Sequence, residues 1–109
     1  MKEKRIQNDI LRAFGSKRSM RLWRANVLAA RMGDRFVRAG VPGQADLTGI
    51  LPGGKRLEVE IKSERGRQTE DQRNFQRMIA WFGGVYVLAR SVEDVAQALK
   101  RAGYDVEAS

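Results

Sequence analysis

Histidine and cysteine are both absent from this sequence of 109 residues. Without histidine the chain has no Ser-His-Asp triad, no histidine general base and no histidine-ligated metal centre. Without cysteine it forms no disulfide, zinc finger or thiolate nucleophile, which fits a reducing compartment. If the chain is an enzyme, its chemistry must therefore come from carboxylates, lysine, hydroxyl groups and a bound metal or cofactor.

Long apolar segments are also missing. No apolar run approaches the ~20 residues that a membrane span needs. The charged start MKEKRIQNDI lacks the apolar region of a signal peptide. We therefore expect a cytoplasmic protein without a membrane partner. The length fits one compact domain over residues 1–109.

Basic side chains are in excess, with 21 Lys+Arg against 13 Asp+Glu, a formal charge of +8 and a pI near 10.6. Such a balance is typical of proteins that bind a polyanion, most simply nucleic acid; the alternative is a basic surface that only confers solubility. Residues 1–67 carry a net charge of +9 and residues 68–109 a net charge of −1. We expect the partner to contact the first two thirds of the chain.

The apolar pattern predicts three helices and five strands. Apolar residues at helical spacing predict helices over residues 3–14, 70–82 and 92–102. Alternating or continuous apolar runs predict strands at 20–27, 34–40, 45–51, 57–63 and 85–89, with a basic loop at 16–19. The order α-β-β-β-β-α-β-α predicts an α/β fold with a mixed sheet flanked by helices.

The second predicted helix has a clear start. Thr69 and Gln72 match a capping box, with threonine at the N-cap and glutamine at the third helical position. An apolar stripe on this helix is expected to lie in the core; its members are Phe75, Met78, Ile79 and Phe82. Trp23 and Trp81 are interpreted as core or interface residues rather than as platforms for stacked bases.

The segment LEVEIKS at 57–63 alternates strictly between apolar and charged residues. This pattern predicts a strand with one buried face and one face that carries Glu58, Glu60 and Lys62. Asp46 belongs to the preceding strand, and the PGG turn at 52–54 predicts that the two strands form a hairpin. Such a hairpin would bring Asp46 beside Glu60.

Two carboxylates and a lysine at one spot suit phosphodiester hydrolysis. Carboxylate oxygens bind hard cations such as Mg²⁺, which keep waters for a substrate phosphate. A bound metal lowers the pKa of water, and a lysine orients that water and offsets developing negative charge. An E-x-K pair alone is more often a surface ion pair. The combination with Asp46, the basic chain and the capped helix favours the catalytic interpretation.

Taken together, these motifs resemble the PD-(D/E)XK nuclease superfamily and, more narrowly, its stand-alone phage-type VRR-NUC domains. The matching segments keep their order over nearly the whole chain: Glu3 in the first helix, RAN at 24–26, GVPGQADLTG at 40–49, LEVEIKS at 57–63, TEDQRNFQ at 69–76 and GGVYVLARS at 83–91. Ala45 departs from the family pattern, which usually has proline before the aspartate. Because proline is not a ligand, the departure weakens the sequence match more than the chemistry.

The resemblance implies a restriction-endonuclease-like sheet and a Mg²⁺ or Mn²⁺ ion. It implies that Asp46, Glu60 and the backbone carbonyl of Ile61 hold this ion. It further implies that Lys62 orients the attacking water and that Gln72 faces the site. If the chain is phage-encoded, its compartment is the cytoplasm of a bacterial host cell.

The resemblance also implies an endonuclease that cuts four-way (Holliday) junctions or other branched DNA as a homodimer. Apolar residues such as Trp23, Trp81 and Phe82 would contact the second copy. One alternative is a monomeric flap or nicking nuclease. Another is a non-catalytic DNA-binding module on the same fold, against which an intact set of Asp46, Glu60 and Lys62 argues.

Five further charged residues have open roles. Glu3 is either a metal ligand or a residue that stabilises the helix dipole. Glu58 either contacts the metal through water or forms a surface salt bridge, and the salt bridge is favoured. Arg24, Arg65 and Arg67 are candidates for DNA backbone contacts, with a solvated arginine equally plausible for Arg24.

Overall fold

The computed structural model describes residues 2–25, 29–38 and 40–106. Its helices are α1 (Lys2–Phe14), α2 (Glu70–Trp81) and α3 (Val92–Arg101), and a 3-10 turn covers Pro52–Gly54. Its strands are β1 (Ser16–Lys17), β2 (Met20–Arg24), β3 (Ala29–Met32), β4 (Arg35–Arg38), β5 (Leu47–Leu51), β6 (Lys55–Ile61) and β7 (Val85–Ala89). All eight predicted elements occur within the described chain, although positions 26, 27 and 39 of two predicted strands lie outside it.

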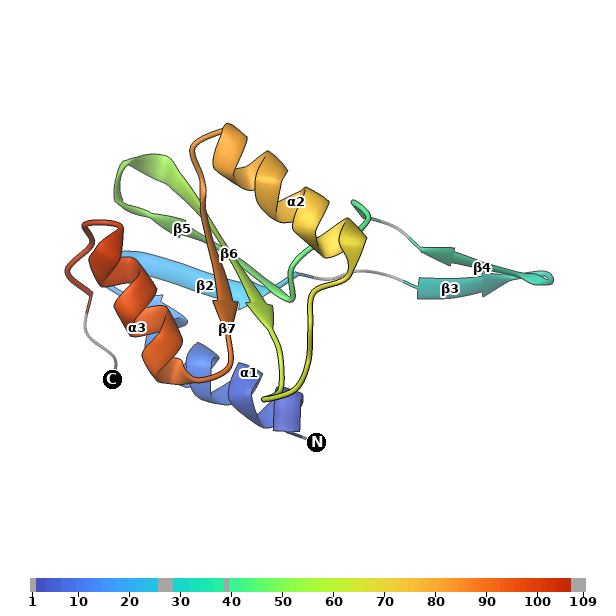
Figure 1. Ribbon diagram of the computed structural model, residues 1–109, viewed down its shortest axis with the longest axis horizontal. Helices are drawn as coiled ribbons and strands as arrows, with labels where there is room; N and C mark the ends of the chain where they lie inside the picture. The colour runs from blue at the N-terminus through green and yellow to red at the C-terminus, as the bar shows by residue number, and fades with distance from the viewer. Residues whose placement is uncertain (1, 26–28, 39, 107–109) are drawn as a thin grey trace.

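Two strands were not predicted, β1 and β3. The basic segment 16–19 is not only a loop, because β1 pairs with β2 in a short hairpin. A two-residue strand is too short for alternation to show in a sequence. Strand β3 pairs antiparallel with β4. These two strands form a separate hairpin that projects from the body of the molecule (Figure 1).

The main sheet has the order β1-β2-β5-β6-β7. Strands β2, β5 and β6 are antiparallel neighbours, whereas β7 runs parallel to β6. A parallel neighbour needs a crossover connection, which α2 provides between β6 and β7. This mixed sheet with helices on both sides confirms the predicted α/β class.

The two faces of β6 have opposite character. Leu57, Val59 and Ile61 enter the larger core, which α1 and α3 cover with residues such as Phe14 and Leu99. Glu58 and Glu60 point to the opposite face because successive strand residues alternate. On that face the smaller core consists of Ala45, Phe75 and Ile79, packed against Tyr86. Helix α2 therefore lies on the same side of the sheet as the charged row (Figure 1).

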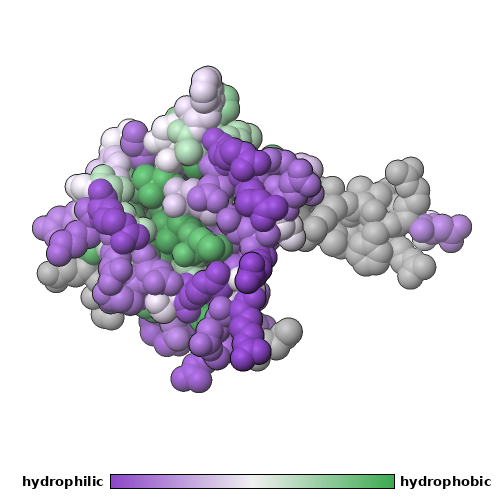
Figure 2. Space-filling model, in the orientation of Figure 1, coloured by the Kyte–Doolittle hydropathy of each residue, from purple (hydrophilic) through white to green (hydrophobic). Residues whose placement is uncertain are grey.

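The prediction that the whole apolar stripe of α2 is buried was wrong in part. Phe75 and Ile79 are buried, but Met78 is 37% exposed and Phe82 is 81% exposed. Trp81 and Trp23 are also exposed, at 85% and 50%, so neither tryptophan is a core residue. The reason is that α2 packs on the sheet through only Phe75 and Ile79, which lie one helical turn apart. Figure 2 shows hydrophobic residues gathered over β7 and hydrophilic ones around them.

The hairpin of β5 and β6 is the element that builds the candidate site. Leu47 pairs with Val59, and Leu51 pairs with Lys55 across the PGG turn. Gly53 and Gly54 have φ values of 80° and 76°, in the left-handed region that glycine adopts without a steric penalty. The predicted hairpin is confirmed, and two glycines at its tip make the tight connection possible.

No helix within the described ranges is both long and apolar enough to cross a membrane.

Candidate active site

Asp46 lies immediately before β5, at the open end of the hairpin. Its Oδ2 accepts a hydrogen bond from the backbone N–H of Ile61 at 2.7 Å. Because Leu47 is opposite Val59, continuing the antiparallel register places Asp46 opposite Glu60. The sequence prediction that the hairpin brings these two carboxylates together is confirmed.

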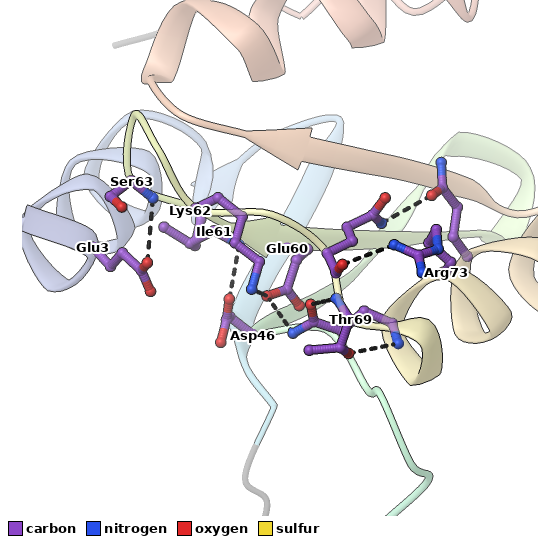
Figure 3. Close-up of polar contacts among 12 residues, drawn as sticks. Glu3, Asp46, Glu60, Ile61, Lys62, Ser63, Thr69 and Arg73 are labelled. Atoms are coloured by element: carbon purple, nitrogen blue, oxygen red, sulfur yellow. Dashed lines mark hydrogen bonds and ion pairs between the residues drawn. The ribbon is translucent and has the colours of Figure 1, made fainter.

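Glu60 is the buried centre of the cluster, with only 3% of its surface exposed. Its Oε2 accepts a hydrogen bond from Gln72 Nε2 at 3.1 Å and lies 3.6 Å from Lys62 Nζ (Figure 3). Its Oε1 is buried and has no hydrogen-bond partner among the described residues. A buried oxygen without a donor is costly, so this atom is suited to bind a cation or a proton.

The electrostatics of the pair follow from this placement. Burial raises the pKa of Glu60 to about 8, and the negative charge of Asp46 adds to the rise, while the ammonium of Lys62 opposes it. At neutral pH Glu60 is therefore largely protonated unless a cation is present. When both carboxylates are ionised, the pair carries one more negative charge than the single ammonium of Lys62 offsets.

Gln72 both caps helix α2 and contacts Glu60 in the candidate site. Thr69 Oγ1 accepts the backbone N–H of Gln72 at 3.1 Å, and Gln72 Oε1 accepts the backbone N–H of Thr69 at 2.9 Å. The predicted capping box is thus present. The amide nitrogen of the same side chain remains free to donate to Glu60. Capping fixes the rotamer of Gln72 and so positions the carboxylate.

The cluster supplies few ligands for a metal. Within the described ranges no group of three or more acidic side chains is placed to hold an ion. Asp46 and Glu60 form a pair of carboxylates, and the family resemblance implies the backbone carbonyl of Ile61 as a further oxygen ligand. Mg²⁺ is bound in this manner in many enzymes, with one or two carboxylates and several waters. The donor set therefore fits Mg²⁺ or Mn²⁺ better than a cation that needs a closed protein cage.

An open groove borders this cluster at Asp46 and Ile61. It has a volume of about 590 Å³ and lies between the start of α1 and the sheet; its lining residues are Lys2, Glu3, Lys4, Gln7, Asp46, Ile61 and Ser63. Glu3 Oε2 accepts the backbone N–H of Ser63 at 3.2 Å, which holds the carboxylate at the rim of the groove. The structure thus brings Glu3 to the same groove as Asp46, and its carboxylate binds a backbone amide there.

Glu58 differs from its expected place. Its side chain is completely buried, and it pairs with Arg56 Nε at 3.0 Å and with the hydroxyl of Thr48. The expected salt bridge is confirmed, but its location on the surface was wrong. The side chain lies on the α2 side of the sheet, flanked by Thr48 on β5 and Tyr86 on β7. Glu58 Oε2 thus has structural partners of its own, whereas Glu58 Oε1 is buried without a hydrogen-bond partner in the described chain. Glu58 lies two residues before Glu60 on the same face of β6.

The three arginines predicted to contact DNA fall into two places. Arg24 is exposed at the end of β2 and donates from Nη2 to Asn8 Oδ1 of α1 at 2.9 Å. It pairs in register with Leu47, the residue after Asp46, and so lies close to the candidate site. Arg65 and Arg67 are exposed on the loop after Lys62 and line a second hollow.

The sequence interpretation missed two arginines of that second hollow, Arg73 and Arg90. Arg90 follows strand β7, and β7 is parallel to β6, which places Arg90 beside the loop after Lys62. A charged residue directly after a buried strand is a usable signal. It becomes specific only when the strand order is known, because the sequence does not say which neighbour β7 pairs with.

Comparison of the chain with protein-family models, curated proteins and solved structures finds no match.

Proposed function

We propose that the protein is a divalent-metal-dependent endonuclease that hydrolyses phosphodiester bonds in DNA, on a restriction-endonuclease-like fold. The observation that carries the proposal is the pair of Asp46 and buried Glu60, one oxygen of which has no donor within the described chain. A lysine completes the cluster at 3.6 Å. Such a site, with a second carboxylate and a lysine beside the unpartnered oxygen, has a clear use for a cation and for a phosphate.

Asp46, Glu60 and the backbone carbonyl of Ile61 would hold Mg²⁺ or Mn²⁺. When bound, the ion lowers the pKa of a coordinated water and neutralises charge on the phosphate. The protein contributes positioning: the Ile61 N–H fixes Asp46, and the Gln72 amide fixes Glu60. Lys62 places its ammonium next to Glu60, where it orients water and offsets the negative charge that develops on the phosphate.

The proposed substrate is a four-way junction or another branched DNA, cut by a homodimer. The resemblance to VRR-NUC domains motivates this choice, together with the basic charge of residues 1–67. A two-fold dimer places two copies of the site to match two symmetry-related strands. Affinity would come chiefly from phosphate contacts, which carry no sequence information.

The test is cleavage of a panel of labelled DNAs in the presence of Mg²⁺ or Mn²⁺. The panel contains a four-way junction, a flap, a nicked duplex, an intact duplex and a cruciform plasmid. Wild-type protein should cut the branched substrates only with the divalent ion. Asp46→Asn and Glu60→Gln should abolish cleavage and leave DNA binding intact or stronger, because each removes negative charge that repels phosphate.

The outcomes separate the candidate functions. Cleavage by either variant within a few-fold of wild type would show that the site is assigned wrongly. Equal cutting of flaps and junctions, without paired incisions on the cruciform, would favour a monomeric structure-specific nuclease. Binding of all substrates without any metal-dependent cleavage would favour a DNA-binding module.

A further inference from the structure

The second hollow lies over the loop that follows the candidate catalytic strand. Its volume is about 600 Å³, and its lining residues are Glu64, Arg65, Gly66, Arg67, Gln68, Arg73 and Arg90. Four of these seven lining residues are arginine. The single carboxylate, that of Glu64, lies 3.7 Å from Lys2 Nζ on α1. The hollow thus has an excess of positive charge on a solvent-accessible surface.

The side chain of Arg90 binds the backbone of this loop. Its Nη1 donates to the backbone carbonyl of Gly66 at 2.9 Å and to that of Glu64 at 3.4 Å, and it also contacts the carbonyl of Ser63. One guanidinium nitrogen thus contacts three backbone carbonyls of a single loop. Such contacts hold a loop in one conformation, because the carbonyls have a fixed donor in place of exchanging water.

The other end of the loop is anchored as well. Gln68 Nε2 donates to the hydroxyl of Tyr86 at 3.2 Å and to Gln76 Oε1 at 2.9 Å. The backbone carbonyl of Gln68 accepts a hydrogen bond from Arg73 Nη1 at 2.9 Å (Figure 3). Strand β7 and helix α2 therefore both hold the segment that carries Arg65 and Arg67.

Gly66 links this loop to the candidate catalytic lysine. A Cβ atom at Gly66 would lie 3.2 Å from Lys62 Cδ and 3.4 Å from Lys62 Cβ. The loop backbone thus packs directly on the aliphatic stem of Lys62. A ligand bound at the loop would lie close to the reacting groups.

We infer that this loop is a preorganised phosphate-binding site for a nucleic acid strand, an inference that rests on the proposed function. Arg65, Arg67 and Arg73 contact a backbone phosphate near the scissile one, and Arg90 is the residue that positions the loop. Guanidinium groups match phosphate oxygens with paired hydrogen bonds, and their charge is not lost at any accessible pH. The site is a second anchor that aligns the strand over Asp46 and Glu60.

The experiment measures binding of a labelled DNA duplex without divalent metal, so that cleavage does not enter. Affinity is recorded over a series of salt concentrations for Arg65→Ala, Arg67→Ala and Arg73→Ala. Each lost phosphate contact should make the negative slope of log K against log[salt] shallower by about 0.9. When the salt concentration rises fourfold, both proteins lose affinity, and the fold-loss of the variant should be about 3.5 times smaller than that of wild type.

Arg101→Ala is the matched control, because this exposed arginine lies at the end of α3, away from the hollow. It removes the same charge and should leave the slope unchanged. If the three loop variants behave like Arg101→Ala, the phosphate site is refuted. A slope that becomes equally shallow in all four variants would also refute the phosphate site, because DNA binding would then depend only on the net charge of the protein.

Arg90→Lys tests the positioning role, since lysine keeps the charge but lacks the planar guanidinium. The salt slope should fall as far as in Arg67→Ala, and hydrogen exchange of the 63–67 amides should accelerate. A wild-type slope and wild-type exchange in Arg90→Lys would overturn this role. If the wild-type protein cleaves DNA but the loop variants keep the wild-type salt slope, the phosphate site alone is refuted. If the loop variants have a shallower salt slope but the wild-type protein does not cleave DNA, the nuclease function alone is refuted.

Discussion

At the scale of single residues, Glu60 is placed where folding and the proposed chemistry have opposite requirements. Folding favours the neutral acid, because burial and the nearby Asp46 penalise a second negative charge. The proposed metal binding would require the carboxylate, because a cation binds the deprotonated form. The Gln72 amide and the Lys62 ammonium lower the cost of the charged form without removing it.

The raised pKa of Glu60 predicts how stability depends on pH without metal. The pKa is about 8 in the folded protein and near its ordinary value, about 4.3, in the unfolded chain. The contribution is fully present below the unfolded pKa and is lost as the pH rises through 8. Glu60→Gln should therefore be more stable than wild type above pH 8, on the order of a few kcal/mol, with no difference near pH 4.

Urea unfolding with a chelator present checks this prediction. Glu64→Gln is the control, because that carboxylate is exposed and its removal should not change the pH profile. Added Mg²⁺ should stabilise wild type at high pH more than it stabilises Glu60→Gln. Parallel pH profiles for wild type and Glu60→Gln would show that Glu60 is not the buried acid described here.

Lys62 acts on water and phosphate in the proposed mechanism, not on the metal. Lys62→Ala should therefore lose most cleavage activity while calorimetric titration still detects binding of Mn²⁺. Lys55→Ala, which removes an exposed lysine from the start of the same strand, should change neither. A folded Lys62→Ala protein that no longer bound the ion would contradict the assigned role.

At the scale of elements, the β5–β6 hairpin and the start of α2 build the candidate site together. The hairpin brings Asp46 to Glu60, and the capping box aims Gln72 at Glu60. Helix α2 itself is held by few apolar contacts, chiefly Phe75 edge-on to Tyr86 at a centroid distance of 6.4 Å, and Ile79. A helix with such a narrow contact depends on its cap for a fixed first turn.

The two functions of Gln72 predict a difference between two cap variants. Thr69→Ala removes one cap hydrogen bond, costs about 1 kcal/mol of stability and leaves the Gln72 contact to Glu60 in place. Gln72→Ala removes the other cap hydrogen bond, which the Thr69 N–H donates to Gln72 Oε1, together with the contact to Glu60. Urea unfolding should show similar losses for the two variants, whereas cleavage should fall much further in Gln72→Ala. Equal rates would mean that Gln72 is only a capping residue.

At the scale of the whole molecule, charge and exposed apolar surface are distributed unevenly. The basic charge lies in residues 1–67, while large apolar side chains are exposed at the C-terminal end of α2. Trp81 and Phe82 lie there side by side in sequence, both more than 80% exposed. Neighbouring exposed aromatic residues are typical of protein interfaces.

The proposed homodimer predicts a mass of about twice 12.3 kDa by light scattering after size exclusion. Phe82→Asp should lower that mass to the monomer value without unfolding the chain, because the side chain contributes little to the core. Val41→Asp, at an exposed apolar residue elsewhere, should leave the dimer intact. A monomeric wild type at micromolar concentration would remove the homodimer from the proposal.

The sequence by itself determined most elements and the central pair of the site. Period-two alternation marks β6, and helical spacing marks α1 and α3, because local backbone geometry sets these periods. The PGG turn is also local, so it predicted the hairpin and hence the meeting of Asp46 with Glu60. The capping box at Thr69 and Gln72 was readable for the same reason.

The tertiary structure decided what depends on contacts between distant segments. The pairing of β7 with β6 brings Arg90 to the loop after Lys62, although 27 positions separate Arg90 from Ser63 in the chain. The burial of Glu58 and the exposure of Phe82 depend on how closely α2 packs on the sheet. Hydrophobicity alone cannot reveal such outcomes, because a pattern shows which face is apolar and not how much of it another element covers.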